Sequence, residues 1–206
     1  MRENVNVSVV RSAIGQSLRM INEKFSAVFG GKGMVSVNCQ DKSYTETGRY
    51  PDSLALNYGF NGDSWSFGDG SISLNMGRKG HAVTLSQKGI ALNTAEDGTA
   101  WAEKRDDSCA FNTGRHGEAS AYGPCGVAVT TGEDSEASSF NGIAAAFGPR
   151  SRAQGELGSW LVLAEMVWEP DGRYHIADIQ ARQVDGKEIL ARRNYRLMNG
   201  EFVPVD

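Results

Sequence analysis

The sequence contains no long hydrophobic run, and this absence bears on where the protein works. Its best apolar stretch, Trp160 to Ala164, ends at Glu165, far short of the roughly 20 residues that a transmembrane helix needs. The opening residues MRENVNVSVVRS lack the continuous apolar core of a secretory signal. We therefore expect no membrane contact and a cytoplasmic location.

Cysteine is also scarce, and basic charge is not in excess. The three cysteines, Cys39, Cys109 and Cys125, form no C-x-x-C pair, so we expect reduced thiols rather than a disulfide framework. The net charge is −4, and no long run of like charges occurs. This argues against direct binding of nucleic acid through a basic surface.

Motifs of catalysis and cofactor binding are missing as well. No H-E-x-x-H, G-x-S-x-G or phosphate loop ending in Gly-Lys-Ser/Thr is present, and no motif connects His81, His116 and His175. Acidic residues such as Asp97 and Asp134 fall in the expected turns, but they share no single repeat position and form no calcium-binding repeat. We therefore expect a non-enzymatic protein with no catalytic residues, no metal and no cofactor.

What the sequence has in abundance is glycine, 25 of 206 residues, together with a short repeat. Pentads with a small residue at the centre recur mostly every nine residues, which is typical of a β-solenoid. Alternate pentads fall into two sets. The first set reads SLALN (53–57), SISLN (71–75), GIALN (89–93), SCAFN (108–112), GVAVT (126–130) and GIAAA (142–146). The second set reads SWSFG (64–68), GHAVT (80–84), GTAWA (98–102), GEASA (117–121), SEASS (135–139) and SRAQG (151–155).

The two sets predict a mainly β fold, a two-sheet β-solenoid (a β-roll or β-helix) with about 18 residues per turn. In each strand, the residues flanking the central one share a face, and the central and last residues share the other. If the flanking positions faced inward, Glu118, Glu136 and Arg152 would be buried, and each unpaired buried charge costs several kcal/mol. We therefore expect the small residues inside, and the first-set asparagines stacked as an amide ladder over Asn38, Asn57, Asn75, Asn93 and Asn112.

This orientation leaves large apolar side chains on the outside of the first sheet. A contiguous apolar surface of this kind usually marks an interface. We expect it to join chains into a homo-oligomer, a trimer, through Leu54, Leu56, Ile72, Leu74, Ile90, Leu92, Phe111, Val127, Val129 and Ile143. On the second sheet we expect partner-binding residues at Trp65, Trp101, Glu118, Glu136 and Arg152.

Residues 34–155 resemble the head repeats of trimeric autotransporter adhesins, whose strands read S-V-A-I-G and S-x-A-x-G. The resemblance implies that one apolar sheet of each chain forms the interior of a trimer while the other sheet faces solvent. Similar repeats occur in phage and prophage proteins. The segment GELGSWLVLAEMVWEPDG (155–172) is similar to the end region of such phage-encoded repeat proteins.

The two ends of the chain differ from the repeats. A helix over residues 12–25, which caps the open end or lies along the apolar face, is predicted by the helical spacing of Ile14, Leu18, Ile21 and Phe25. An antiparallel meander is predicted by the turn signals at 170–172, 185–186 and 199–200. The expected division is an N-terminal strand and helix cap (1–33), the solenoid (34–158) and a C-terminal meander cap (159–206).

Two functions follow as hypotheses. The first is an oligomeric binding protein of phage or mobile-element origin that binds and blocks a host protein, with host defence as the target class. The alternative is a structural or adhesive component of the virus particle, such as a tail-fibre or baseplate module. In both cases the link to phage rests on the resemblance. An active site formed only between subunits is a third possibility that one sequence cannot display.

Overall fold

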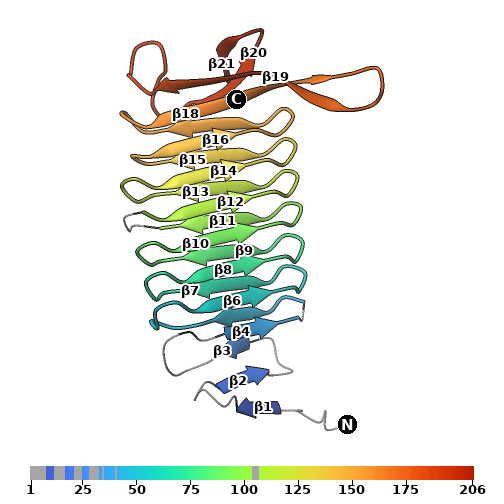
Figure 1. Ribbon diagram of the computed structural model, residues 1–206, viewed down its shortest axis with the longest axis vertical. Helices are drawn as coiled ribbons and strands as arrows, with labels where there is room; N and C mark the ends of the chain where they lie inside the picture. Colours follow the sequence, from blue (N-terminus) through green and yellow to red (C-terminus); the bar gives the residue numbers. More distant parts are fainter. Residues whose placement is uncertain are drawn as a thin grey trace.

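The computed structural model describes residues 8–11, 17–20, 25–27, 33, 35–39, 41–103 and 107–206 of the chain. These residues form strands, turns and bends, and none of them lies in a helix that is long and apolar enough to cross a membrane. The chain winds as a β-solenoid of about seven turns, with the strands stacked along the long axis (Figure 1). The mainly β, two-sheet solenoid predicted from the repeat is thereby confirmed.

Each turn of the solenoid contributes one strand to each of two sheets, and successive strands of a sheet pair in parallel. The first sheet contains β4 (Val35–Asn38), β6 (Leu54–Asn57), β8 (Ile72–Asn75), β10 (Ile90–Asn93), β12 (Cys109–Asn112), β14 (Val127–Thr130) and β16 (Ile143–Ala146). The second sheet contains β3 (Phe25–Ala27), β5 (Tyr44–Glu46), β7 (Asp63–Ser66), β9 (His81–Thr84), β11 (Thr99–Ala102), β13 (Glu118–Ala121), β15 (Glu136–Ser139) and β17 (Arg152–Gly155).

The strands align the repeat in register from one turn to the next. Ile72 of β8 pairs with Ile90 of β10, as the 18-residue period predicts. One pentad is misplaced in the prediction: in SWSFG the residue that pairs with Ala82 is Ser64, and not the central Ser66. Two serines stand at alternate positions there, so both registers place a small residue inside and Trp65 outside.

The interior of the solenoid is filled by small side chains, as the charge argument predicts. The central residues of the pentads are fully buried, including Ala55, Ala82, Ala91, Ala100, Ala110, Ala119, Ala128, Ala137, Ala144 and Ala153. Larger apolar side chains enter the core at the C-terminal end, where Leu161 and Leu163 are buried. The two sheets therefore lie close together, and the outer faces carry the large side chains.

Buried asparagines form the polar part of this interior. The amide nitrogen Nδ2 of Asn75 donates to Oδ1 of Asn93 at 3.1 Å, and Nδ2 of Asn93 donates to Oδ1 of Asn112 at 3.3 Å. Asn57 instead donates to the backbone oxygens of Ser43 and Asp63, at 3.1 and 3.2 Å. Among the described residues, the ladder predicted over five asparagines is thus formed by three of them.

The turns from the first sheet to the second repeat one backbone conformation. In each of them one residue has a positive φ between 54 and 59°. In the turns before the last one, the N–H of this residue donates to a carbonyl of the next turn, as from Lys79 to Glu96 at 3.0 Å and from Asp97 to Arg115 at 2.9 Å. These residues stack along one edge of the solenoid as what we name the turn column, namely Lys42, Asn61, Lys79, Asp97, His116, Asp134 and Arg150.

Two antiparallel hairpins close the C-terminal end, one on each sheet (Figure 1). β18 (Trp160–Trp168) continues the first sheet beside β16 and pairs with β19 (Tyr174–Gln183). β20 (Asn194–Met198) continues the second sheet beside β17 and pairs with β21 (Glu201–Val205). The predicted antiparallel pairing is confirmed, but the strands do not form one continuous meander, because each hairpin extends a different sheet.

The turn signals of this region differ in outcome. The signals at 170–172 and 199–200 lie in the two hairpin turns, and Asn199 and Gly200 have positive φ values of 53 and 73°. The prediction of a hairpin turn at 185–186 is wrong, because residues 184–193 cross from one sheet to the other. There, Oδ1 of Asp185 accepts the N–H groups of Lys187, Glu188 and Ile189 at 2.8 to 3.0 Å, and this bonding shapes the crossing.

The helix predicted over residues 12–25 is not found where the chain is described. Ser17–Met20 form β2, antiparallel to β1 (Ser8–Arg11), and Phe25–Ala27 form β3, parallel to β5. Residues 12–16 and 21–24 lie outside the described residues. A short isolated helix is marginal in water, whereas an open strand edge offers unpaired N–H and C=O groups to the next segment.

Candidate functional site

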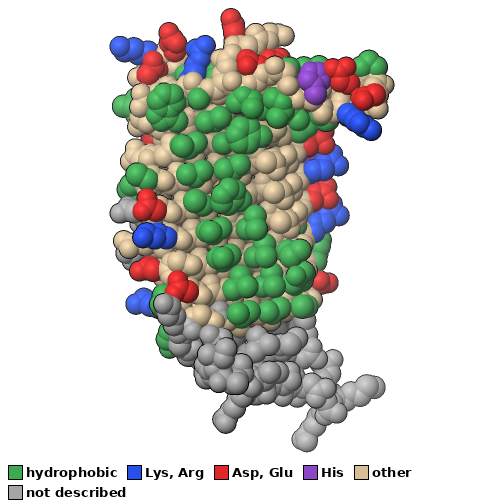
Figure 2. Space-filling model, in the orientation of Figure 1, with side chains coloured by type: hydrophobic (Ala, Val, Ile, Leu, Met, Phe, Trp, Pro, Cys, Tyr) green, Lys and Arg blue, Asp and Glu red, His purple; other side chains and the backbone are tan. Residues whose placement is uncertain are grey.

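The outer face of the first sheet is apolar along the whole solenoid, and we name it the apolar stripe. All ten predicted interface residues lie on it, at positions flanking a buried central residue. Ile72 and Ile143 are exposed, and the other eight are half-buried. Figure 2 shows hydrophobic side chains running in columns along the long axis. Neighbours about 4.8 Å apart cover each other's flanks, which accounts for the partial exposure.

The apolar stripe continues onto the C-terminal hairpin, which the sequence reading missed. Trp160 pairs in register with Ile143 and is 46 % exposed. Val162 pairs in register with Ala145. Ile179 of β19 lies opposite Ala164 and is also exposed. The sequence holds a signal for it, because Leu161 stands where the next central residue is due, but the change in residue pattern after 159 favours a separate cap.

The N-terminal half of the second sheet carries an aromatic surface. Trp65 and Trp101, both predicted to bind a partner, lie in register on either side of Val83, which is only 2 % exposed. The ring of Tyr44 lies 6.1 Å from that of Trp65. The Nε1 atoms of the two tryptophans are buried and have no hydrogen-bond partner among the described residues.

The C-terminal half of the second sheet is polar, and Glu136 is its centre. In the register Glu118, Glu136 and Arg152 are consecutive, so the structure brings the three predicted residues together. Nε of Arg152 donates to Oε2 of Glu136 at 2.9 Å, and Nε2 of Gln154 donates to Oε1 at 2.5 Å. Asn194 of the C-terminal hairpin adds a bond of 3.3 Å to Oε2. Glu136 thus ties the last hairpin to the solenoid.

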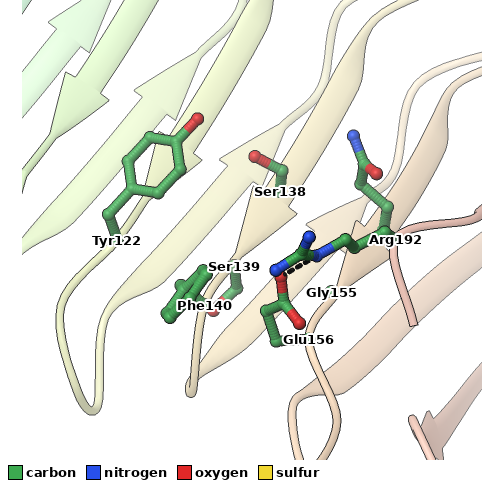
Figure 3. A pocket seen from close by; sticks show the side chains of 8 residues that line it. Tyr122, Ser138, Ser139, Phe140, Gly155, Glu156 and Arg192 are labelled. Atoms are coloured by element: carbon green, nitrogen blue, oxygen red, sulfur yellow. Dashed lines mark hydrogen bonds and ion pairs between the residues drawn. The ribbon is translucent and has the colours of Figure 1, made fainter. Parts of the chain in front are cut away.

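A cleft of about 270 Å³ opens beside this polar network, and we name it the edge cleft. It is bordered by the aromatic rings of Tyr122 and Phe140, and Ser138 lies between them and Arg192 of the C-terminal crossing (Figure 3). Tyr122 and Phe140 are 41 and 43 % exposed. Arg192 forms an ion pair with Glu156. Sequence reading missed this site, because the aromatic residues stand just beyond the pentads.

Charged side chains alternate in sign along the edge of the turn column (Figure 2). His116 of this column lies between Asp97 and Asp134, at 3.5 and 3.8 Å, and Arg150 follows at the next turn. Asp97 and Asp134 lie two turns apart in this column. Asp63 lies in β7 and Asp107 in a turn on the other edge, so part of the acids share a repeat position and the set as a whole does not. Insertions of one residue in some turns hide that recurrence in the sequence.

The carboxylates along the turn column are paired with arginines. A bidentate contact from Arg150, at 3.0 and 2.6 Å, lowers the pKa of Asp134 from its ordinary value. Glu96, Asp97 and His116 lie close enough to share a cation, but Nε of Arg78 is 3.1 Å from Glu96. Because that guanidinium already neutralises the carboxylate, the cluster gives no support to a metal site.

The remaining titratable residues singled out above have local roles. The Nδ1 atom of His81 contacts the hydroxyl of Thr99, and His175 forms an ion pair with Glu169 at 2.8 Å. Cys109 lies on the apolar stripe, and burial raises the pKa of its thiol. Burial likewise raises the pKa of Asp63 at the aromatic surface.

Comparison of the chain with protein-family models, with curated proteins and with solved structures found no match.

Proposed function

We propose that the protein is a non-enzymatic binding protein whose chains associate through the apolar stripe into a homotrimer. The observation that carries the proposal is the extent of the stripe, which runs over every turn from Val35 to Trp160. A side chain such as Leu or Ile gains roughly 1.5–3 kcal/mol when it is fully removed from water. Most of the stripe residues are already half-buried, so about half of that gain is available at most positions.

A second copy of the chain is the occupant that fits the apolar stripe. The stripe repeats at one strand spacing, and another copy offers a face with the same period, the same length and the same apolar character. None of the ten predicted interface residues is charged, so equivalent faces meet without repulsion. Three parallel solenoids around one axis satisfy closed cyclic symmetry.

The second sheet is the surface that such an assembly leaves outside. Its aromatic half presents Trp65 and Trp101, and its polar half presents Arg152 beside Glu136. Tryptophan and arginine are enriched among the residues that dominate protein interfaces. This composition supports a protein partner at the second sheet.

For the identity of the partner we propose a host protein, blocked in the cytoplasm by a product of a phage or mobile element. This part rests on the resemblance of the repeats. Affinity capture from host lysate should retain one stoichiometric protein with the native chain and lose it with Trp101→Ala. If capture is the same with Trp101→Ala and with Tyr58→Ala, an exposed aromatic outside the second sheet, the partner does not use this surface.

The alternative, a structural or adhesive virion component, is favoured by the elongated shape of the solenoid with a closed C-terminal end (Figure 1). Mass spectrometry of purified phage particles decides between the two settings. Detection of the chain in the particles at a fixed copy number supports the virion role and contradicts a purely cytoplasmic one.

Self-association is tested by light scattering over a dilution series. We expect a mass of three chains that does not depend on concentration. Ile90→Asp should reduce the mass to one chain, because the trimer would bury an unpaired charge at a cost of several kcal/mol. Thr99→Asp introduces the same charge on the second sheet of the same turn. It is the matched control and should leave the trimer intact. A native chain that is monomeric throughout the series overturns the proposal.

A further inference from the structure

The edge cleft has the chemistry of a binding site in its own right, and it lies outside the residues assigned above to self-association or to a protein partner. We propose that it binds an uncharged sugar residue, the end group of a glycan. The inference is independent of the proposed trimer, because the cleft lies on the second sheet and the apolar stripe lies on the first.

The cleft forms where small polar side chains on the sheet lie beside large aromatic rings in the adjoining turns. Ser138 and Gln154 stand at one outward position of β15 and β17, in the column that holds Trp65 and Trp101 further towards the N-terminus. Tyr122 directly follows β13, and Phe140 directly follows β15. Small polar residues beside large rings leave a trough. Its volume of about 270 Å³ is slightly below the roughly 300–1,000 Å³ of small-molecule sites, so it suits one ring-sized group.

The hydrogen bonds around the cleft leave acceptors facing the ligand. The hydroxyl of Ser120 donates its proton to Glu118 at 2.6 Å, so the 2.8 Å contact between Ser120 and Ser138 uses the proton of Ser138. The Oγ atom of Ser138 therefore offers only lone pairs to the cleft. One N–H of the Gln154 amide Nε2 donates to Glu136, and the second N–H stays available beside Oε1, which is a second acceptor. A ligand that satisfies both acceptors must supply hydrogen-bond donors, as sugar hydroxyls do.

The charge of the cleft argues for a neutral ligand. Its two charged lining residues, Arg192 and Glu156, form an ion pair with each other. A phosphate or carboxylate would meet the paired Glu156, and a cation would meet the paired Arg192. The ion pair therefore favours neither a negatively nor a positively charged ligand.

The exposed rings supply the apolar half of the site. The C–H face of a pyranose packs against the electron-rich face of an aromatic ring, while its hydroxyls lie around the rim. Tyr122 and Phe140 border the cleft on the side away from Arg192 (Figure 3). A ligand with one apolar face and several donors fits this pairing better than an aromatic peptide side chain, because tyrosine and tryptophan each offer one donor and phenylalanine offers none.

The test uses the full chain and saturation-transfer NMR with a panel of methyl glycosides of glucose, galactose, mannose and N-acetylglucosamine. We expect at least one glycoside to bind, with Tyr122→Ala and Phe140→Ala each weakening it about tenfold, equivalent to about 1.4 kcal/mol. Tyr58→Ala, an exposed aromatic in a turn on the other edge, is the matched control and should bind as the native chain does. Gln154→Leu removes the second acceptor of the cleft and should not bind.

Three results would overturn the sugar site. These are no binding by any glycoside of the panel, binding that persists in both aromatic variants, and binding of N-acetyl-tyrosinamide in place of every glycoside. Unfolding of one aromatic variant is detected by its melting curve, and Gln154→Leu then decides. Because Ile90→Asp should change the mass without changing glycoside binding, failure of this inference is distinguishable from failure of the trimer.

Discussion

The amide of Asn75 donates to the amide of Asn93 one turn above it, at 3.1 Å, inside a solenoid whose interior otherwise consists of small side chains. Each amide has a second task, since Nδ2 of Asn75 also donates to the carbonyl of Gly77 at 2.9 Å, and Nδ2 of Asn93 to that of Ala95 at 3.1 Å. The same side chain thus joins neighbouring turns and fixes the start of its own turn.

Removal of one amide from this ladder should destabilise the fold. Asn93→Ala removes one hydrogen-bond partner from each of the buried groups of Asn75, Asn112 and Ala95. Each unsatisfied buried group costs about 1–3 kcal/mol, so we expect a loss of about 2–4 kcal/mol in the free energy of unfolding, measured in urea. Thr94→Ala changes the exposed neighbour and should have an effect below about 0.5 kcal/mol. Equal effects of the two substitutions would contradict the role of the ladder.

Glu136 should stabilise the C-terminal hairpin as well as the sheet. Glu136→Ala removes the acceptor of Arg152, Gln154 and Asn194. Because these hydrogen bonds involve a charged group, we expect a loss of about 1.5–3 kcal/mol, and faster amide exchange in β20. Glu118→Ala, which removes an acceptor of Ser120 on the preceding strand, is the control with the smaller expected loss. Unchanged exchange in β20 would show that Glu136 does not hold the hairpin.

Thiol reactivity reports on the apolar stripe. Cys39 and Cys125 are exposed, whereas Cys109 is half-buried on the stripe, with a pKa raised by burial and by Asp107. Thiolate is the reactive form, so we expect two fast thiols and one slow thiol with Ellman's reagent. In the Ile90→Asp variant the slow thiol should react faster, because the chains no longer cover it. A rate for Cys109 that is the same in both proteins would argue against burial of the stripe.

The pair of Asp134 and Arg150 predicts a pH dependence of stability. The folded-state pKa of Asp134 is lowered by Arg150, so the pair stabilises the fold above the unfolded pKa of about 3.9 and loses this contribution as pH falls below it. Arg150→Gln should therefore lower the melting temperature at pH 7, and the difference from the native chain should shrink towards pH 3. Arg173→Gln removes a longer, more exposed contact with Asp171 and should change little at either pH. If the difference in melting temperature between the native chain and Arg150→Gln stays constant with pH, ionisation of Asp134 does not cause it.

Much of the fold could be predicted from single residues in a repeat. Glu136 and Arg152 each stand directly before the central alanine of their pentad. Their charges decide which face of the strands lies inside, because burial of an unpaired charge is unfavourable. The segment at 12–25 shows the opposite case. Helical spacing over so short a stretch is a weak signal, and β2 and β3 form there because a strand edge lies next to them in space.

The sequence alone determined the solenoid, its period and the apolar character of one outer face, because side-chain periodicity in a strand is a local property and parallel stacking repeats it from turn to turn. Only the tertiary structure decided which distant groups meet. Asn194 reaches Glu136 across 58 positions, and Arg192 closes the cleft beside Tyr122 and Phe140. No repeat links these residues, since the crossing at 184–193 leaves the periodic part of the chain, and its path is set by which sheet the final hairpin extends.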